Sequence, residues 1–331
     1  MPKATAIIAQ RKGVVELVEV DVPPPGPNEV QVRVHRTLIS HGTERAWILA
    51  RENMEREFPF PLGYAGAGVV EAVGSDVTRF KVGDRIAGHM THRSLANINE
   101  NALVDRMPDH MTFDQGSFVT MAGVGLQGVR KARIEVGEAV MVLGLGLIGQ
   151  FSVASAFVNG GLPVIAVDRV KERLDIALQI GADIAIDNSD PAWKDKLNEA
   201  TMGNGPAVVI EATGFTEVVN QGLEVVAHFG RVVLQGSTQG IDTVDFYKNV
   251  HCKQVSIIGA LNPGNPTGQS RPGHWTRPDE VTAVVKLIAS GRFKTEPLVT
   301  ERVSLSGVVK AYDEILSSKF GSLGTIIEWD R

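Results

Sequence analysis

A glycine-rich turn near the middle of the chain limits the possible folds more than any other feature. It follows the apolar run AVMVL, and it reads Gly144-Leu145-Gly146-Leu147-Ile148-Gly149. A helix is predicted over Gln150–Val158, and Asp168 ends the next apolar run about 20 residues beyond the turn. A strand, a glycine turn, a helix and an acid in this order are the pattern of a dinucleotide-binding βαβ unit.

The residues of the turn have separate predicted roles at a cofactor. Gly144 permits the tight turn, Gly146 lets the backbone approach a pyrophosphate, and Gly149 lets the helix pack closely on the strand. Leu147 and Ile148 are predicted to offer backbone N–H groups to the phosphates, where the helix dipole also favours negative charge. A glycine turn without a ligand is the alternative, since the chain has 35 glycines. The strand, helix and acid argue against it.

Asp168 bears on the choice of cofactor. A carboxylate at this position accepts hydrogen bonds from the ribose hydroxyls of NAD and repels the 2′-phosphate of NADP. Arg169 opposes this preference, because an arginine can pair with that phosphate. We expect the repulsion to dominate, so NAD is predicted and NADP is disfavoured. Asp168 could also cap the predicted helix Lys171–Ile180, which is compatible with cofactor binding.

The region around the turn, residues 118–262, has the rhythm of a doubly wound α/β domain. Its apolar runs alternate with helical segments, as in a parallel sheet with crossover helices. Six strands are predicted, at Ala139–Leu143, Pro163–Val167, Asp183–Ile186, Val208–Glu211, Arg231–Leu234 and Val255–Gly259. Ligands of such sheets bind at the carboxyl ends of the strands. The cofactor wall is therefore predicted to include Thr213, Gly214, Gly236, Ser237, Ala260, Leu261 and Asn262. Ordinary strand-end turns are the alternative for any one of them.

The two ends of the chain have a different character. Residues 1–117 contain short alternating runs such as VQVRV and GVVEAV between turn clusters, which predicts a largely antiparallel β unit. Residues 263–331 are predicted to hold helices at Glu280–Ser290 and Gly307–Ser318, followed by a last strand, Gly324–Trp329. With 331 residues the chain suits two domains better than one.

Composition and charge exclude several classes of protein. A net charge of −5 provides no basic surface for nucleic acid or an anionic membrane. Cys252 is the only cysteine, so neither an internal disulfide nor a four-thiolate zinc site can form. The N-terminus lacks the pattern of a secretory signal, and no apolar run reaches the roughly 18 to 20 residues that span a bilayer. We therefore expect a cytoplasmic protein.

Several motifs resemble the medium-chain dehydrogenase/reductase superfamily, and together they extend over the whole chain. They include PPPGPNEVQVRVHRTLIS, PLGYAGAGVVEAVG, FKVGDRI, GLGLIGQ, GRVVLQG and LVTERVSLSGVVKAYDEIL. The resemblance implies a GroES-like catalytic domain made of residues 1–117 and 263–331, and a Rossmann NAD-binding domain at 118–262. It also implies a homodimer joined through the last Rossmann strand, Val255–Gly259.

The zinc ligands of that superfamily are missing here. Zinc-dependent members use a Cys before a Gly-Thr-Asp-like triplet, a Gly-His-Glu motif, and a third ligand before the Rossmann domain. The matching segments read Ser40-His41-Gly42-Thr43-Glu44, Gly63-Tyr64-Ala65 and Thr120-Met121-Ala122-Gly123. The first two resemble a zinc-free branch that includes bacteriochlorophyllide a dehydrogenase, from which the chain departs at Ala65. His41, Glu44, His89 and His92 remain metal candidates, but we favour loop histidines and predict no zinc.

Without a metal, side chains must polarise the reacting oxygen. The predicted catalytic residues are Tyr64, Ser40, His41, Thr43 and Glu44. Tyr64 would act as hydrogen-bond donor or acid, Ser40 and Thr43 would relay the proton, and His41 is a possible base. Glu44 would orient the site or pair with the arginine that follows it. The alternatives are a packed core phenol for Tyr64, and helix caps for Ser40 and Thr43 at a helix beginning near Arg45.

A long loop, Asn262–Pro278, is rich in Pro and Gly. It contains the predicted substrate residues Arg271, His274 and Trp275, together with Arg277. Long ordered loops in enzymes are often lids or binding loops, so this one could cover a carboxylate, phosphate or sugar substrate. A surface or dimer-contact loop is the alternative.

Three functions agree with these features. The first is a zinc-independent, NAD(H)-dependent enzyme that interconverts a small alcohol and its ketone or aldehyde, with a polyol or sugar-like compound as one candidate alcohol. The second is an enoyl or quinone reductase, whose usual preference for NADPH conflicts with Asp168. The third is a non-catalytic dinucleotide-binding sensor. The polar residues at the former zinc positions favour the first.

Overall fold

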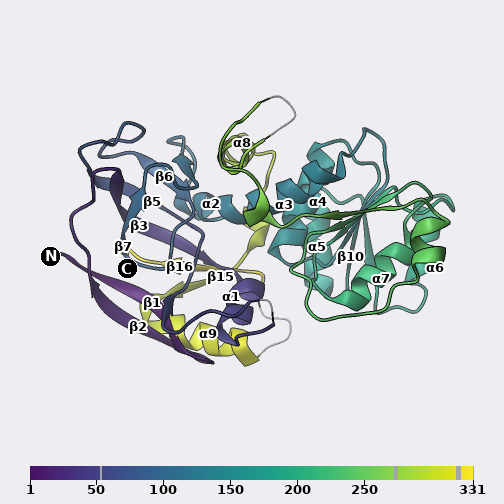
Figure 1. Cartoon of the computed structure of the whole chain (residues 1–331), viewed down its shortest axis with the longest axis horizontal. Helices are drawn as coiled ribbons and strands as arrows, with labels where there is room; N and C mark the ends of the chain where they lie inside the picture. Colours follow the sequence, from purple (N-terminus) through teal and green to yellow (C-terminus); the bar gives the residue numbers. More distant parts are fainter. Residues whose placement is uncertain (53, 272–274, 318–321, 331) are drawn as a thin grey trace. The chain divides into compact units, whose positions relative to one another are not determined.

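The chain forms two compact units, each built from separate stretches of sequence. A computed structural model describes residues 1–52, 54–271, 275–317 and 322–330 (Figure 1). The first unit comprises Met1–Thr120, Arg277–Gly291 and Leu298–Arg331. The second comprises Met121–Thr276 and Arg292–Pro297. The sequence predicted domain boundaries at 117/118 and 262/263, whereas the boundaries between the compact units lie at 120/121 and 276/277. The short segment Arg292–Pro297 also belongs to the second unit, not to the first as predicted.

The second unit is built on one six-stranded parallel sheet. Its strand order is β11-β10-β9-β12-β13-β14. The strands are β9 (Val140–Leu143), β10 (Val164–Asp168), β11 (Ile184–Asp187), β12 (Val208–Glu211), β13 (Arg231–Leu234) and β14 (Ser256–Gly259). Each lies within a residue of its predicted position, so the predicted doubly wound α/β domain is confirmed. The strand order reverses at β9, whose neighbours are β10 and β12; such a reversal creates a crevice at the carboxyl ends of the strands.

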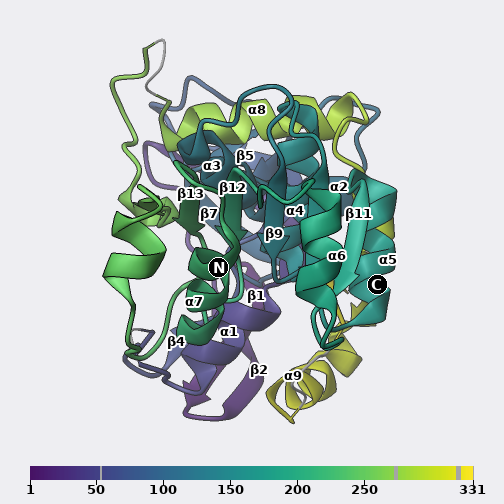
Figure 2. The ribbon, with the colours of Figure 1, turned by 90° about the vertical axis from the view of Figure 1, so that its right-hand side faces the viewer.

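Helices surround this sheet (Figure 2). They are α3 (Val119–Ala132), α4 (Leu147–Val158), α5 (Lys171–Ile180), α6 (Trp193–Ala200) and α7 (Thr216–Val225), and a π-helix covers Tyr247–His251. Because the helices cover the sheet, its strands carry near-continuous apolar runs. The side chains of Met141, Ile165, Val209 and Val232 are fully buried in this core. Helix α4 begins at Leu147, not at the predicted Gln150, so its first turn includes part of the glycine motif.

The first unit contains two sheets that are largely antiparallel. A three-stranded sheet has the order β2-β1-β4, and a seven-stranded sheet has the order β15-β16-β3-β5-β6-β8 with β7 also pairing with β3. The strands are β1 (Lys3–Arg11), β2 (Val14–Asp21), β3 (Glu29–Ile39), β4 (Phe60–Pro61), β5 (Gly66–Val73), β6 (Arg85–Gly88), β7 (Leu95–Asn99), β8 (Val104–Arg106), β15 (Val299–Ser304) and β16 (Gly324–Glu328). Apolar residues from both ends of the chain share one core, since Ile7, Val32 and Ile327 are all fully buried in it. The predicted GroES-like β domain is confirmed.

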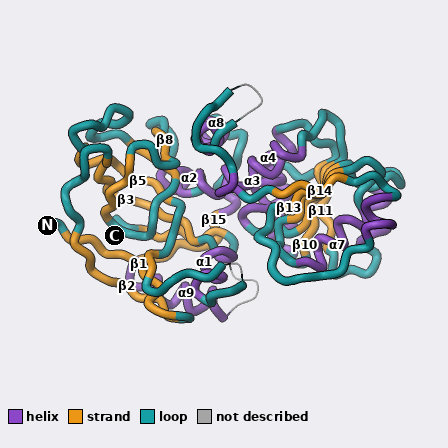
Figure 3. Tube along the Cα trace, in the orientation of Figure 1, coloured by secondary structure: helices purple, strands orange, loops and turns teal. Residues whose placement is uncertain are grey.

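Short helices complete the first unit, and Figure 3 distinguishes them from the strands. They are α1 (His41–Ile48), α2 (Phe113–Ser117), α8 (Arg277–Ala289) and α9 (Val308–Ser317). The chain also has 3-10 turns at Asn262–Gly264, Glu296–Leu298 and Leu305–Gly307. Two predictions are corrected. Helix α1 begins at His41, not near Arg45. Helix α8 begins at Arg277, so the end of the predicted loop Asn262–Pro278 is helical. No helix of the described residues is both long and apolar enough to cross a bilayer.

Candidate functional site

The glycine turn of the second unit has the geometry that its sequence predicts. Gly144 has a φ of +87°, which a residue with a side chain rarely adopts. A Cβ on Gly149 would overlap the carbonyl oxygen of Gly144, so the helix could not approach the strand with a larger residue there. A Cβ on Gly146 would meet nothing within 4 Å. Gly146 also caps α4 without a side chain, which leaves an open cradle at the helix N-terminus where Leu147 and Ile148 begin the helix. These residues fit the diphosphate of a dinucleotide.

Asp168 ends β10, and its carboxylate is tied to the backbone of this turn. Oδ2 accepts from the N–H of Leu145 at 2.6 Å, and Oδ1 accepts from the N–H of Arg169 at 2.7 Å and of Val170 at 3.0 Å. The predicted capping of α5 is corrected, since Val170 is the N-cap and no side chain caps that helix. Asp168 therefore shapes the glycine turn in addition to its predicted contact with the ribose.

A second acid, Glu211, shapes the next turn along the same edge of the sheet. Its carboxylate accepts from the backbone N–H of Thr213 at 2.6 Å and of Gly214 at 3.0 Å, and from the Thr213 hydroxyl. Desolvation raises the pKa of Glu211 despite these bonds. Gly236 approaches Gly214 so closely that a Cβ on it would overlap the Gly214 backbone. Sequence analysis missed Glu211, although its place at the end of a predicted strand was a usable signal.

The remaining predicted residues of the second unit lie beyond its last two strands. Ala260 is buried directly after β14, while Leu261 is 65% exposed. Ser237 follows β13, and Asn262 begins a 3-10 turn. Arg271 is exposed, and Trp275 packs under a guanidinium, with Cζ of Arg130 3.3 Å from the centroid of its ring. His274 lies outside the described residues.

In the first unit, three predicted residues come together as a cluster of hydroxyl groups. The phenol of Tyr64 donates to Oγ of Ser40 at 2.7 Å, and the phenol oxygen also lies 3.2 Å from Oγ1 of Thr43. Ser40 is the N-cap of α1, but its side chain makes no capping bond, so the predicted capping alternative is wrong for Ser40. Desolvation raises the pKa of Tyr64 to about 12, even though its bonds to Ser40 and Thr43 lower it. Tyr64 is consequently a protonated donor at neutral pH.

Glu44 lies fully buried beneath this cluster. Its Oε1 accepts from the backbone N–H of Ser40 at 2.8 Å, and its Oε2 accepts from the hydroxyl of Tyr312 at 2.5 Å. His92 Nε2 lies 3.2 Å from Oε2. Burial raises the pKa of Glu44, but His92, Tyr312 and Ser40 together outweigh it and hold the pKa below its usual value. The carboxylate is therefore ionised, and His92 Nε2 must carry the proton that it donates.

This arrangement corrects the predicted role of Glu44. It does not pair with Arg45, whose guanidinium donates to the carbonyl oxygen of Leu316. Instead it anchors the start of α1. Tyr312, on α9, was missed by sequence analysis because it lies 268 residues away along the chain.

The histidines near the cluster are in different surroundings. His41 Nε2 lies 2.9 Å from Oγ1 of Thr325 on β16. His89 is exposed, and its ring centroid is 6.2 Å from that of Tyr64. Desolvation, Arg277 and Arg56 lower the pKa of His89, which favours the neutral imidazole.

The donor set does not fit the zinc of the superfamily. Of the four candidate residues, His41, Glu44, His89 and His92, the structure pairs Glu44 with His92, and the oxygens of Glu44 already accept three hydrogen bonds. Among the described residues, no group of three or more His, Cys, Asp or Glu side chains could hold a metal ion. The hydroxyl groups of Ser40 and Tyr64 stand at two of the matching positions, and neutral hydroxyls are not the ligands of protein zinc sites.

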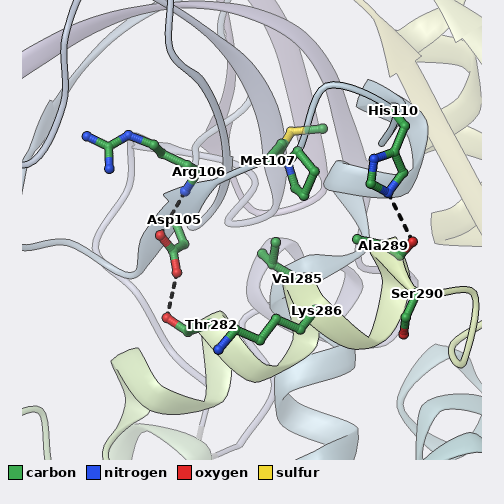
Figure 4. A pocket seen from close by; sticks show the side chains of 10 residues that line it. Asp105, Arg106, Met107, His110, Thr282, Val285, Lys286, Ala289 and Ser290 are labelled. Carbon is green, nitrogen blue, oxygen red and sulfur yellow. Dashed lines mark hydrogen bonds between the residues drawn. The ribbon is translucent and has the colours of Figure 1, made fainter.

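A separate cavity of about 590 Å³ lies elsewhere in the first unit, between the end of β8 and helix α8 (Figure 4). Its walls are held together by a hydrogen bond from Thr282 to Asp105 and by one between His110 Nε2 and the carbonyl oxygen of Ala289 at 3.1 Å. None of the predicted site residues lines it. The hydroxyl cluster, and not this cavity, is the candidate catalytic site.

Comparisons with known proteins agree with both units. The family described as "Alcohol dehydrogenase GroES-like domain" matches residues 26–129, and the family described as "Zinc-binding dehydrogenase" matches residues 148–272. Together they cover more than half of the chain. Sorbitol dehydrogenase from Homo sapiens is 26% identical over 345 aligned residues, which cover 94% of this chain and 92% of that protein.

Solved structures show the same fold at lower identity. An oxidoreductase/dehydrogenase of unknown specificity from Escherichia coli superposes with a TM-score of 0.87 at 22% identity, covering 99% of each chain. A dehydrogenase from Sinorhizobium meliloti bound to NADP superposes with a TM-score of 0.84 at 20% identity, covering 99% of this chain and 100% of the other. The chain thus belongs to the medium-chain dehydrogenase/reductase superfamily, whose members include the zinc-type alcohol dehydrogenases.

Proposed function

We propose that this protein is an NAD(H)-dependent oxidoreductase that interconverts a small alcohol and its ketone or aldehyde without a catalytic zinc. The observation that carries the proposal is the cluster in which the hydroxyls of Ser40 and Thr43 both lie within hydrogen-bond distance of the Tyr64 phenol. Ser40 and Tyr64 stand where zinc-dependent relatives have metal ligands. Similarity to sorbitol dehydrogenase supports a polyol as the alcohol. The chain would then belong to a zinc-free branch of its superfamily.

Tyr64 would act on the reacting oxygen. A bound nicotinamide supplies or accepts the hydride, and the protein supplies position and proton handling. In reduction, the carbonyl oxygen gains negative charge in the transition state, and a preorganised donor stabilises that charge. With a pKa of about 12, the Tyr64 hydroxyl remains protonated. It can provide this hydrogen bond when the Ser40 hydroxyl turns to donate to the phenol oxygen instead of accepting from it.

Oxidation needs an acceptor for the proton of the alcohol. Tyr64 is unsuited to this task, because its raised pKa disfavours the phenolate that would have to form on the way. We propose His89 in place of His41, since its pKa is lowered, its ring is close to Tyr64, and it is exposed to solvent. The alcohol proton would pass to His89, and the hydroxyls of Ser40 and Thr43 would hold the phenol in position.

The cofactor would bind along the glycine turn at 144–149 and beside Asp168. The carboxylate of Asp168 supports NAD, because it would repel a 2′-phosphate. NADP is the second candidate, since Arg169 follows Asp168 and a structure of the same fold holds NADP. Thr213, Gly214 and Gly236 would form the adjoining wall.

Turnover measurements test the proposal. The purified protein is assayed with NAD and a panel of polyols, and with NADH and the matching ketones and conjugated enones, by absorbance of NADH. We expect turnover of alcohols and ketones that survives a chelator, and no stoichiometric zinc by elemental analysis. Activity that vanishes with the chelator and returns with a divalent metal would overturn the metal-free mechanism. Turnover of enones alone would favour an enoyl or quinone reductase, and tight NADH binding without turnover would favour a sensor.

We also propose that two copies associate through β14. This strand is at one edge of the sheet and pairs only with β13 within the sheet. Ile257 on it is 39% exposed, and the nearby Leu261 and Tyr247 are 65% and 73% exposed. An exposed apolar edge strand readily pairs with another strand.

A further inference from the structure

Two arginines stand near the Tyr64 cluster, and the alcohol chemistry proposed above gives neither of them a task. The first is Arg56, whose Cζ lies 3.6 Å from the centroid of the Trp47 ring. The Trp47 ring in turn lies against that of Tyr64, with centroids 5.4 Å apart. Arg56 is exposed, so its guanidinium is a cation held beside the site by an indole and open to a ligand.

The second is Arg277, the first residue of α8. Its Nε is buried, and among the residues that the structure describes none accepts a hydrogen bond from that atom. Arg277 and Arg56 both act electrostatically on His89, whose ring neighbours that of Tyr64. The fields of the two cations therefore meet at the His89 ring.

The nearby carboxylates do not neutralise these arginines by direct pairing. Glu44 attracts Arg56 and Glu280 attracts Arg277. Glu44, however, is fully buried and already accepts from Ser40, His92 and Tyr312. Within the described ranges, no Asp or Glu oxygen lies within 4.0 Å of a nitrogen of Arg56 or Arg277. Both guanidinium groups thus retain donors for an anion.

We propose that the substrate of the Tyr64 site carries an anionic group, a phosphate ester or a carboxylate, which Arg56 and Arg277 bind. A guanidinium presents a planar fork of donors that matches the oxygens of either group. The hydroxyl cluster would take the reacting end of the substrate and the arginines its charged end. This assignment rests on the proposed function for the reacting end only.

Matched ligands and variants test this assignment. Binding of sorbitol, sorbitol 6-phosphate and gluconate is measured by calorimetry with and without NAD, so that the readout does not depend on turnover. R56Q and R277Q remove one charge each and keep a hydrogen-bonding side chain. R11Q removes one charge from an exposed position at the end of β1, and it serves as the control. Melting temperatures check that each variant folds.

We expect the wild type to bind one of the charged ligands more tightly than sorbitol. R56Q and R277Q should each weaken that binding about tenfold, the loss typical of one charge-assisted hydrogen bond, and leave sorbitol binding unchanged. R11Q should bind like the wild type. The preferred charged ligand identifies the group as phosphate or carboxylate.

Other outcomes overturn the assignment. Equal affinity of the wild type for charged and neutral ligands would overturn it. A preference for charged ligands that R56Q and R277Q leave unchanged, or that R11Q reduces as much as they do, would also overturn it. Arginine-dependent binding without turnover of any alcohol or ketone would sustain the anion site and refute the proposed oxidoreductase. Turnover of neutral polyols without a preference for charged ligands would support the proposed oxidoreductase and refute the anion site.

Discussion

Tyr64 is the side chain on which the proposed chemistry depends most directly. Y64F removes only the hydroxyl, so the transition-state oxygen loses its donor while the ring still packs against Trp47 and His89. We expect kcat to fall by about 10²- to 10³-fold, the usual loss for one such donor, with an unchanged Kd for NADH. Steady-state kinetics and fluorescence titration with NADH measure the two quantities. Y247F, at an exposed tyrosine of the second unit, is the control, and full activity in Y64F would remove the phenol from the mechanism.

Gly63, the neighbour of Tyr64, links backbone conformation to the buried pair of Glu44 and His92. It has a φ of +83°, and a Cβ there would overlap the His92 ring. G63A should therefore cost the strain of a positive φ, about 1–2 kcal/mol, and further energy for displacing the ring, about 1–3 kcal/mol. Gly13 has a φ of +77° with nothing within 4 Å of an added Cβ, so G13A should cost the backbone strain alone.

Urea unfolding of both variants measures this difference. The expected order of stability is wild type, then G13A, then G63A. Equal losses in the two variants would mean that the His92 ring moves aside without cost.

At the scale of single elements, the turns after parallel strands test the cofactor assignment. Asp168 and Asp187 are the last residues of the neighbouring strands β10 and β11 and are paired in register. Only Asp168 bonds to the glycine turn, through Leu145, whereas Asp187 bonds to Ser189. D168A should therefore lower kcat/KM with NADH about tenfold or more and shift preference toward NADPH, because a ribose acceptor and a repulsive charge are both lost. D187A should leave the preference unchanged.

The ratio of kcat/KM for NADH to that for NADPH is the measurement. The ratio matters more than either value, because the loss of the bond to Leu145 also weakens the turn for both cofactors. An unchanged ratio in D168A would refute the assignment of NAD by this carboxylate.

The elements differ in how far the sequence predicts them. The strands of the parallel sheet were predicted almost to the residue, because each is a short apolar run buried on both faces. Helix α1 was placed too late. Its start depends on Glu44 binding the N–H of Ser40, and Glu44 is stabilised there by His92 and Tyr312, which come from distant parts of the chain. The local sequence pattern predicts the glycine turn that would bind the cofactor. It does not show which distant side chains a buried acid such as Glu44 will contact in the fold.

At the scale of the whole molecule, the same limit applies to the candidate catalytic site. Motif positions identified Tyr64, Ser40 and Thr43, and the structure brings these three together. It places His41 with Thr325 instead, since ring orientation depends on a strand 284 residues further along the chain. Arg56 lies in a segment without a motif, so only its contact with Trp47 reveals it.

The proposed assembly through β14 can be tested with one backbone donor. The N–H groups of Ser256 and Ala260 point inward, to the carbonyl oxygens of Gly230 and Leu234. By the alternation of a strand, the N–H of Ile257 points to the free edge. I257P removes that donor without removing a bond to β13, whereas I257T keeps the N–H and a β-branched side chain as the control. Sedimentation velocity should show a dimer for the wild type and I257T and a shift toward monomer for I257P. A monomeric wild type would exclude the association. A dimer that I257P leaves intact would mean that the two copies associate through another surface.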